Sequence, residues 1–266
     1  MTVDRALLAR YFRQLADLGI DDVFFDTMTA DDALAVMSGR TCTEVDSTEV
    51  DSRELLSTRS PFAARDAAAG AVTAGAPGNG ATADRLSALG AEAAVCTSCG
   101  LHAGRGSVVF GEGSPTAQVV VVGEAPGQEE DRTGRPFVGR AGQLLDTLLM
   151  SVGLPRGDVY ICNTLKCRPP QNRNPQPDEL AACGRFLREQ LDAISPRVML
   201  AVGKFAAQAL LETEQSIGRL RNVVHSYGGT PLIVTYHPAY LLRSPQMTRI
   251  AWQDFQMLRR VLDEQA

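Results

Sequence analysis

Residues 118–145 read QVVVVGEAPGQEEDRTGRPFVGRAGQLL, and this stretch decides the fold class. Val119–Val122 predicts a buried parallel strand, and Ala141–Val152 predicts an amphipathic helix. A strand that leads through a glycine-rich loop into a helix is where open α/β sheets place their ligands. The loop has no Gly-Lys-Ser/Thr ending, and its carboxylates would repel phosphate. Its acidic residues and Phe137 therefore favour a flat, neutral, hydrogen-bonding ligand such as a nucleobase.

Strands and helices alternate along the rest of the chain. We expect further strands at Val159–Asn163, Val198–Val202 and Leu232–Tyr236, and helices at Thr82–Ala94, Asp178–Ile194, Lys204–Glu212 and Arg249–Asp263. This rhythm predicts an α/β fold, a three-layer αβα arrangement around a central, mostly parallel four-stranded sheet. The loops after the first, second and fourth strands should meet at one edge of that sheet.

The first third of the chain differs in composition from the rest. Residues 1–90 hold 8 Arg against 14 Asp and Glu, a balance of −6, whereas residues 91–266 hold 18 Lys and Arg against 17 Asp and Glu, a balance of +1. We predict an acidic, partly helical N-terminal extension over 1–62, an Ala/Gly-rich linker over 63–83 and an α/β domain over 84–266. The amphipathic stretch Asp4–Leu18 either packs on the main body or docks another protein.

Hydropathy and charge limit which partners and which cellular location we expect for this protein. The chain contains no apolar run long enough to span a membrane, and its first residues are charged and amphipathic. We therefore expect a cytoplasmic protein without a membrane partner. The near-neutral remainder of the chain leaves room for a local basic face that binds nucleic acid.

The cysteines suggest a metal centre. Cys96 and Cys99 form a closely spaced pair, Cys167 follows a predicted strand, and Cys183 lies early in the next helix. Four thiolates that converge in this way suit a zinc ion or an iron–sulfur cluster, and the wide spacing of the second pair favours the cluster. Cys162 lies inside a predicted strand, which is typical of a small buried apolar residue.

Three segments carry a family resemblance: GEAPGQEEDRTGRPFVG at 123–139, NTLKCRPP at 163–170 and HPAYLLR at 237–243. With the four cysteines in place, the chain resembles the family 4, iron–sulfur uracil-DNA glycosylases over about 94–264. The resemblance implies the uracil-DNA glycosylase-like fold and a monomer that binds uracil-containing DNA. It also implies hydrolysis of the N-glycosidic bond, which releases free uracil and leaves an abasic site. The implied cofactor is a [4Fe-4S] cluster held by Cys96, Cys99, Cys167 and Cys183.

The resemblance also implies roles at the site. Asn163 would read the uracil edge, Phe137 would stack on the flipped base, and His237 would donate a hydrogen bond to uracil O2. The implied catalytic residues are His237, Glu124 and Glu130, and the implied uracil-binding residues are Glu124, Ala125, Glu130, Phe137, Asn163 and His237. Either glutamate could stabilise the cationic sugar or orient the attacking water.

DNA contacts are expected from two further places. Leu241 and Leu242 would form an apolar wedge where the base leaves the stack, with Arg243 on a phosphate. Lys166 and Arg168, on the cysteine-bearing loop, would contact backbone phosphates.

Overall fold

The computed structural model describes residues 79–265. The predicted N-terminal extension and its helix at Asp4–Leu18 lie outside these residues. The helices are α3 (Asn79–Ala94), α4 (Gln128–Thr133), α5 (Arg140–Ser151), α6 (Pro177–Ile194), α7 (Lys204–Leu211), α8 (Ile217–Leu220), α9 (Pro238–Arg243) and α10 (Thr248–Glu264). The strands are β1 (Glu112–Gly113), β2 (Val119–Gly123), β3 (Tyr160–Asn163), β4 (Val198–Val202), β5 (His225–Tyr227) and β6 (Thr230–Thr235).

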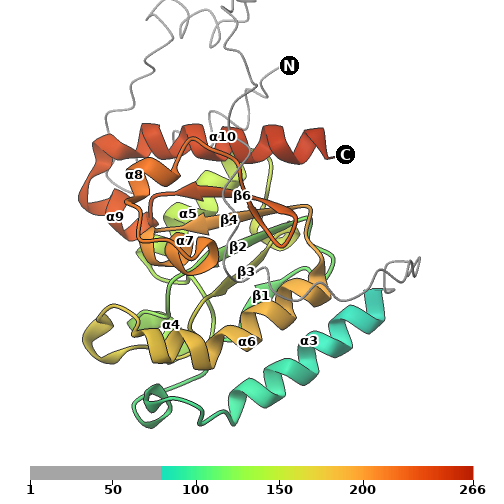
Figure 1. Cartoon of the computed structure of the whole chain (residues 1–266), viewed down its shortest axis with the longest axis vertical. Helices are drawn as coiled ribbons and strands as arrows, with labels where there is room; N and C mark the ends of the chain where they lie inside the picture. Colours follow the sequence, from blue (N-terminus) through green and yellow to red (C-terminus); the bar gives the residue numbers. More distant parts are fainter. Residues whose placement is uncertain (1–78, 266) are drawn as a thin grey trace, which may run out of the picture.

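The strands of the described region form one sheet in the order β1-β3-β2-β4-β6-β5 (Figure 1). The four predicted strands, now β3, β2, β4 and β6, pair in parallel, and the prediction of a mostly parallel sheet is confirmed. Within residues 79–265 the sheet has six strands rather than the predicted four, because β1 and β5 add antiparallel edges. These two edge strands are two and three residues long, too short for a periodic pattern to reveal them.

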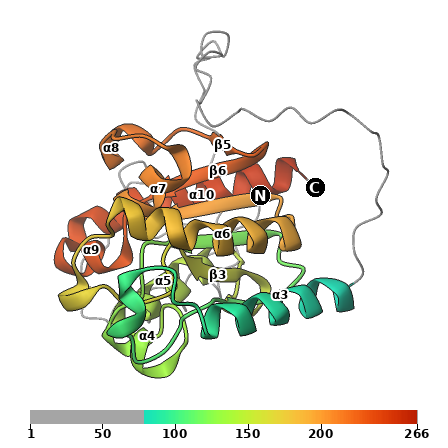
Figure 2. The same ribbon diagram turned by 60° about the horizontal axis from the view of Figure 1, so that its bottom comes forward.

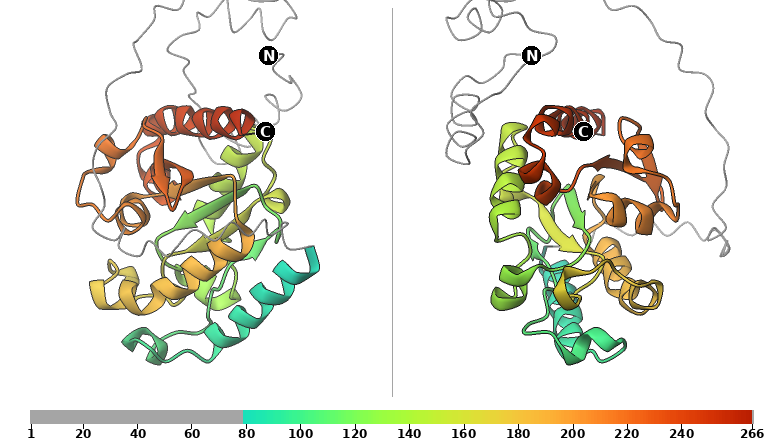
Figure 3. Two further views of the ribbon diagram at one scale, coloured as in Figure 1. Left: turned by 45° about the vertical axis from the view of Figure 1, so that its right-hand side comes forward. Right: turned by 90° about the vertical axis from the view of Figure 1, so that its left-hand side faces the viewer.

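Side chains on β2 alternate between two apolar cores, which explains the three layers. Val119 and Val121 pack with α5 and α10 in one core, and Val120 and Val122 pack with α3, α6 and α7 in the other. Helices α3 and α6 lie side by side (Figures 1 and 2). Helices α10 and α6 lie on opposite sides of the sheet (Figure 3). The predicted αβα arrangement is therefore confirmed.

The boundary between the predicted linker and the domain needs a correction. Helix α3 begins at Asn79, so residues 79–83 belong to a helix rather than to the linker. Leu86, Leu89 and Ala93 are buried, which gives this part of the chain a packed face that the Ala/Gly-rich composition hides. Among residues 79–265, no helix is long and apolar enough to cross a membrane.

The carboxyl ends of three strands bring the predicted loops together. Gly123, the last residue of β2, pairs with Asn163, the last residue of β3. Val202 at the end of β4 pairs with Thr235 at the end of β6, and the N–H of Gly203 donates to the Thr235 carbonyl at 2.9 Å. The loops that follow β2, β3 and β6 therefore share one edge of the sheet, as predicted.

Candidate active site

Gly123 lies where Phe137 and Asn163 meet. A Cβ placed on Gly123 would lie 2.3 Å from Oδ1 of Asn163 and 2.6 Å from Cζ of Phe137. Only a hydrogen fits in that space, so the glycine allows the amide and the aromatic ring to approach the end of β2 together. Phe137, which is 6% exposed, comes from the loop between α4 and α5, whereas Asn163 ends β3.

Asn163 presents an unpartnered acceptor inside the protein. The residue is 1% exposed, and its Oδ1 atom has no hydrogen-bond partner. A buried acceptor without a donor costs about 1–3 kcal/mol, so this atom is suited to a donor supplied by a ligand. Its backbone neighbourhood is fixed, because the Thr164 and Leu165 N–H groups donate to the carbonyls of Gly123 and Glu124 at 2.9 and 3.0 Å.

His237 completes the constellation at the start of α9. Its ring centroid lies 5.7 Å from that of Phe137, with 31° between the ring planes. The backbone N–H of Ala239 donates to Nδ1 at 3.1 Å, so a neutral ring carries its proton on Nε2. Burial and, to a smaller extent, Arg243 together lower the pKa of His237 to about 4, although Glu130 partly offsets them. The imidazole is therefore neutral near pH 7 and presents Nε2–H as a donor.

The two candidate glutamates have different surroundings. Burial raises the pKa of Glu124 to about 7, and its carboxylate makes no hydrogen bond or ion pair within residues 79–265. Glu130 instead accepts from the backbone N–H groups of Val138 and Gly139 at 2.9 and 3.1 Å, and from Gly127 at 3.1 Å. Through these contacts Glu130 holds the loop that carries Phe137. Of the two glutamates, Glu124 is the one whose carboxylate has no partner among the described residues.

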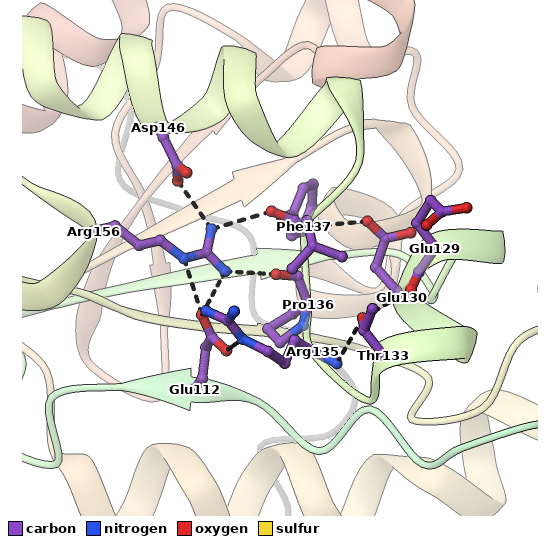
Figure 4. Close-up of polar contacts among 10 residues, drawn as sticks. Glu112, Glu129, Glu130, Thr133, Arg135, Pro136, Phe137, Asp146 and Arg156 are labelled. Carbon is purple, nitrogen blue, oxygen red and sulfur yellow. Dashed lines mark hydrogen bonds and ion pairs between the residues drawn. The ribbon is translucent and has the colours of Figure 1, made fainter.

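Arg156 is a residue of this site that the sequence reasoning missed. It lies on a 3-10 turn, η2 (Arg156–Asp158), and its guanidinium reaches the carbonyls of Pro136 and Phe137 (Figure 4). Glu112 on β1 and Asp146 on α5 pair with it. No local pattern marks this arginine, because its partners lie on three separate segments.

Ala125 also lies near the site, but on its cysteine-facing side. It is partly buried and packs against the apolar cluster that contains Leu101, Leu165 and Cys167. It therefore lies between the end of β2 and the cysteine region.

Two of the predicted DNA contacts are wrong in this structure. Lys166 is 1% exposed, and its Nζ donates to the Asn163 carbonyl at 2.8 Å and to Oε1 of Gln190 at 2.6 Å. Burial lowers the pKa of Lys166, and the side chain supports the backbone of Asn163 rather than facing a phosphate. Leu241 is fully buried in the core beside α5 and α10, so it is no surface wedge.

The other predicted DNA contacts stay accessible. Arg243 is exposed and makes no ion pair within the described residues, and Leu242 is partly buried against the core. Arg168 is partly exposed and donates to Oδ1 of Asn172 at 2.7 Å. Tyr240, on the same helix α9 as Leu242 and Arg243, is 36% exposed, and its ring lies 5.2 Å from that of Tyr236.

The four predicted cysteines converge. Cys96, Cys99, Cys167 and Cys183 line one pocket with Arg105 and His102. Arg105 donates to the Cys96 carbonyl at 2.7 Å and to Sγ of Cys167 at 3.5 Å, which ties the first cysteine pair to the loop after β3. Within residues 79–265, no group of three or more His, Cys, Asp and Glu side chains is arranged to hold a single metal ion. Cys162 is fully buried in β3, as predicted.

Comparison with known families defines the class of protein that this fold and site represent. A family model described as the uracil DNA glycosylase superfamily matches residues 110–256, which include β2, β3, β4, β6 and the three converging loops. This match covers more than half of the chain and assigns the α/β domain to that superfamily.

Curated relatives narrow the assignment. The type-4 uracil-DNA glycosylase of Thermotoga maritima is 48% identical over 174 residues, covering 64% of this chain and 91% of the relative. The type-4 enzyme of Archaeoglobus fulgidus is 44% identical over 61% of this chain and 86% of the relative, and that of Sulfurisphaera tokodaii is 40% identical over 67% and 85%. The chain belongs to the type-4 uracil-DNA glycosylase family.

Proposed function

We propose that this chain excises uracil from DNA by hydrolysing the bond between uracil N1 and the sugar C1′. The observation that carries the proposal is the unpartnered Oδ1 of Asn163, which lies with the Phe137 ring at Gly123, while that ring lies 5.7 Å from the ring of His237. A base in a duplex is inaccessible to such a site, so the nucleotide must flip out of the stack before it enters.

Asn163 reads the edge of the base. Uracil carries a donor at N3, which matches the free acceptor on the amide, whereas cytosine carries an acceptor there. A cytosine in the same pose would leave two acceptors facing each other in a buried site. The unmet hydrogen bond costs about 1–3 kcal/mol, which corresponds to about 5-fold to 150-fold discrimination.

Phe137 stacks on the flipped base. Its ring is almost fully buried and lies against Gly123 at the floor of the site. Stacking of a base on an aromatic ring contributes about 1–3 kcal/mol and is independent of the hydrogen-bonding edge. The ring therefore contributes affinity, and Asn163 contributes selectivity.

His237 stabilises the leaving group. When the C1′–N1 bond breaks, its electron pair passes to uracil, and negative charge develops on O2. The Nε2–H of the neutral imidazole donates to that oxygen, so the stabilisation is strongest when the charge is largest. No proton needs to transfer from His237, since its neutral state already provides the donor.

Glu124 acts on the sugar side. Its carboxylate stabilises the positive charge that develops at C1′ and orients the water that attacks this carbon. The water oxygen bonds to C1′, the C1′–N1 bond breaks, and the water proton passes to the carboxylate, while uracil leaves as an anion that takes up a proton from solvent. The products are free uracil and an intact abasic site.

DNA contacts come from the accessible side chains around the site. Arg243 and Arg168 contact backbone phosphates, and Leu242 with Tyr240 presents an apolar surface near the site of the flipped base. Lys166 and Leu241 support this surface from within the protein.

The cysteine pocket holds an iron–sulfur cluster. Four thiol side chains around one pocket fit the all-cysteine donor set of a [4Fe-4S] cluster, with Cys96, Cys99, Cys167 and Cys183 as its ligands. Bound there, the cluster would supply a structural link between the segment before β1 and the loop that follows Asn163. Iron, sulfide and zinc analysis of the purified protein, with its visible absorbance, tests this assignment; stoichiometric zinc without iron would contradict it.

A cleavage assay tests the proposed activity. Cluster-bearing protein is incubated with a single-stranded oligonucleotide that contains one uracil, and free uracil and alkali-labile strand breaks are measured. Wild type should release uracil, and Asn163→Ala should lose most of this activity. Protein that leaves uracil uncut, or that forms an SDS-stable adduct with the DNA, would overturn the proposal.

A further inference from the structure

Phe137 has a backbone conformation that needs external support. Its φ angle is 50°, in the left-handed region that bulky residues disfavour. A loop with this conformation persists only where the surrounding structure holds it in place.

Arg156 holds the carbonyls of this turn. Its Nη2 donates to the Pro136 carbonyl at 2.6 Å, and its Nη1 donates to the Phe137 carbonyl at 3.2 Å. On the other side of the loop, Oε1 of Glu130 accepts from the next N–H groups along the chain (Figure 4). Helix α5 closes the remaining side, because a Cβ on Gly142 would lie 1.8 Å from the Phe137 carbonyl oxygen.

The guanidinium is itself held by two carboxylates. Nε and Nη2 of Arg156 donate to Oε1 of Glu112 at 2.9 and 2.7 Å, and Nη1 donates to Oδ1 of Asp146 at 2.9 Å. An arginine has five N–H donors in a rigid, planar fork. Here one bond from Nε, two from Nη1 and two from Nη2 use every donor. Lysine has three donors on one nitrogen and cannot reproduce this fork.

We propose that Arg156, clamped by Glu112 and Asp146, is a positioning residue that fixes the Phe137 ring for stacking on the flipped base. The proposal rests on the proposed role of Phe137 in uracil binding. It extends the site to β1 and η2, which contribute no side chain to the reacting atoms. Arg156 with Glu112 and Asp146 therefore affects the base only through the backbone turn at Pro136 and Phe137.

A double-mutant cycle tests whether Arg156 acts through Phe137. Arg156→Lys keeps the charge and loses the fork, and we expect single-turnover uracil excision to slow by about 10-fold to 100-fold. In a Phe137→Ala background the same substitution should change the rate by less than about 3-fold, because the ring that it positions is gone. If Arg156→Lys slows excision equally in the wild-type and Phe137→Ala backgrounds, or slows it in neither, the proposal is overturned.

Arg135 provides a matched control. It also pairs with Glu112, at 2.7 and 3.0 Å, but its side chain is 61% exposed and does not bond to the Pro136 or Phe137 carbonyls. Arg135→Gln therefore removes a cation from the same carboxylate without releasing the turn. Its excision rate should stay within about 3-fold of wild type.

A second measurement does not depend on activity. Protein labelled with carbon-13 in its nine phenylalanines gives ring signals by NMR, and the signal lost in Phe137→Ala identifies Phe137. This signal should shift or broaden in Arg156→Lys and keep its wild-type position in Arg135→Gln. If the wild type leaves uracil uncut, the proposed function fails, but this spectrum still tests whether Arg156 fixes the Phe137 ring. An unchanged Phe137 signal in Arg156→Lys would refute that role of Arg156.

Discussion

Gly203→Ala tests how the imidazole of His237, which we propose to stabilise the leaving uracil, is held in position. Gly203 follows β4 with φ 99° and ψ 163°, a conformation that is essentially restricted to glycine. A Cβ there would lie 3.0 Å from Cβ and 3.1 Å from Cδ2 of His237. These atoms are the anchored part of the side chain rather than a flexible end, so the imidazole must move by a few tenths of an ångström.

The substitution should affect stability and rate separately. An alanine in this backbone region costs about 1–3 kcal/mol. For a domain of this size, such a loss lowers Tm by about 2–12 °C. Displacement of the Nε2–H donor from its place opposite uracil O2 should slow excision by about 10-fold to 100-fold.

Gly153→Ala is the matched control, measured in the same assays. Gly153 also has a left-handed φ, 72°, but no atom lies within 4 Å of its added Cβ. It should lose stability to a similar degree while its single-turnover excision rate stays at the wild-type level. Thermal unfolding and alkali cleavage of the abasic product provide the two readouts.

The rate effect must pass through His237. In a His237→Ala background, the displaced ring is absent, and Gly203→Ala should slow excision no further. If Gly203→Ala lowers Tm yet excises uracil at the wild-type rate, the position of His237 does not limit the reaction and the reasoning is wrong.

Three further predictions concern charge and metal. Since burial raises the pKa of Glu124 to about 7, its carboxylate forms above that pH, and the rate of uracil excision should rise as the pH increases through about 7. The same rise in the pH–rate profile of Glu124→Gln would contradict this role. Because Lys166 is buried, Lys166→Met should keep the salt dependence of binding to single-stranded DNA, whereas Arg243→Gln should reduce its logarithmic slope by about 0.7. Cys183→Ser should lose iron and visible absorbance, and Cys162→Ser, altered inside β3, should retain both.

Much of the fold follows from local patterns in the sequence. The valine run of β2 and the alternation of strands and helices determine a parallel sheet, because apolar period and loop chemistry are properties of neighbouring residues. The glycine-rich loop, the Asn163 segment and the His-Pro segment could be placed at the ends of strands on the same grounds. Their convergence then follows from parallel pairing, which puts those ends at one edge.

The orientation of individual side chains was decided only by tertiary packing. Lys166 and Leu241 lie in segments whose composition suits DNA contact, yet both turn inward, because partners remote in sequence bury them. Arg156 shows the converse, since three distant segments make it a clamp and no local motif marks it. Sequence determines which chemistry is available near a site; contacts between remote segments decide which groups face the ligand and which hold the site in place.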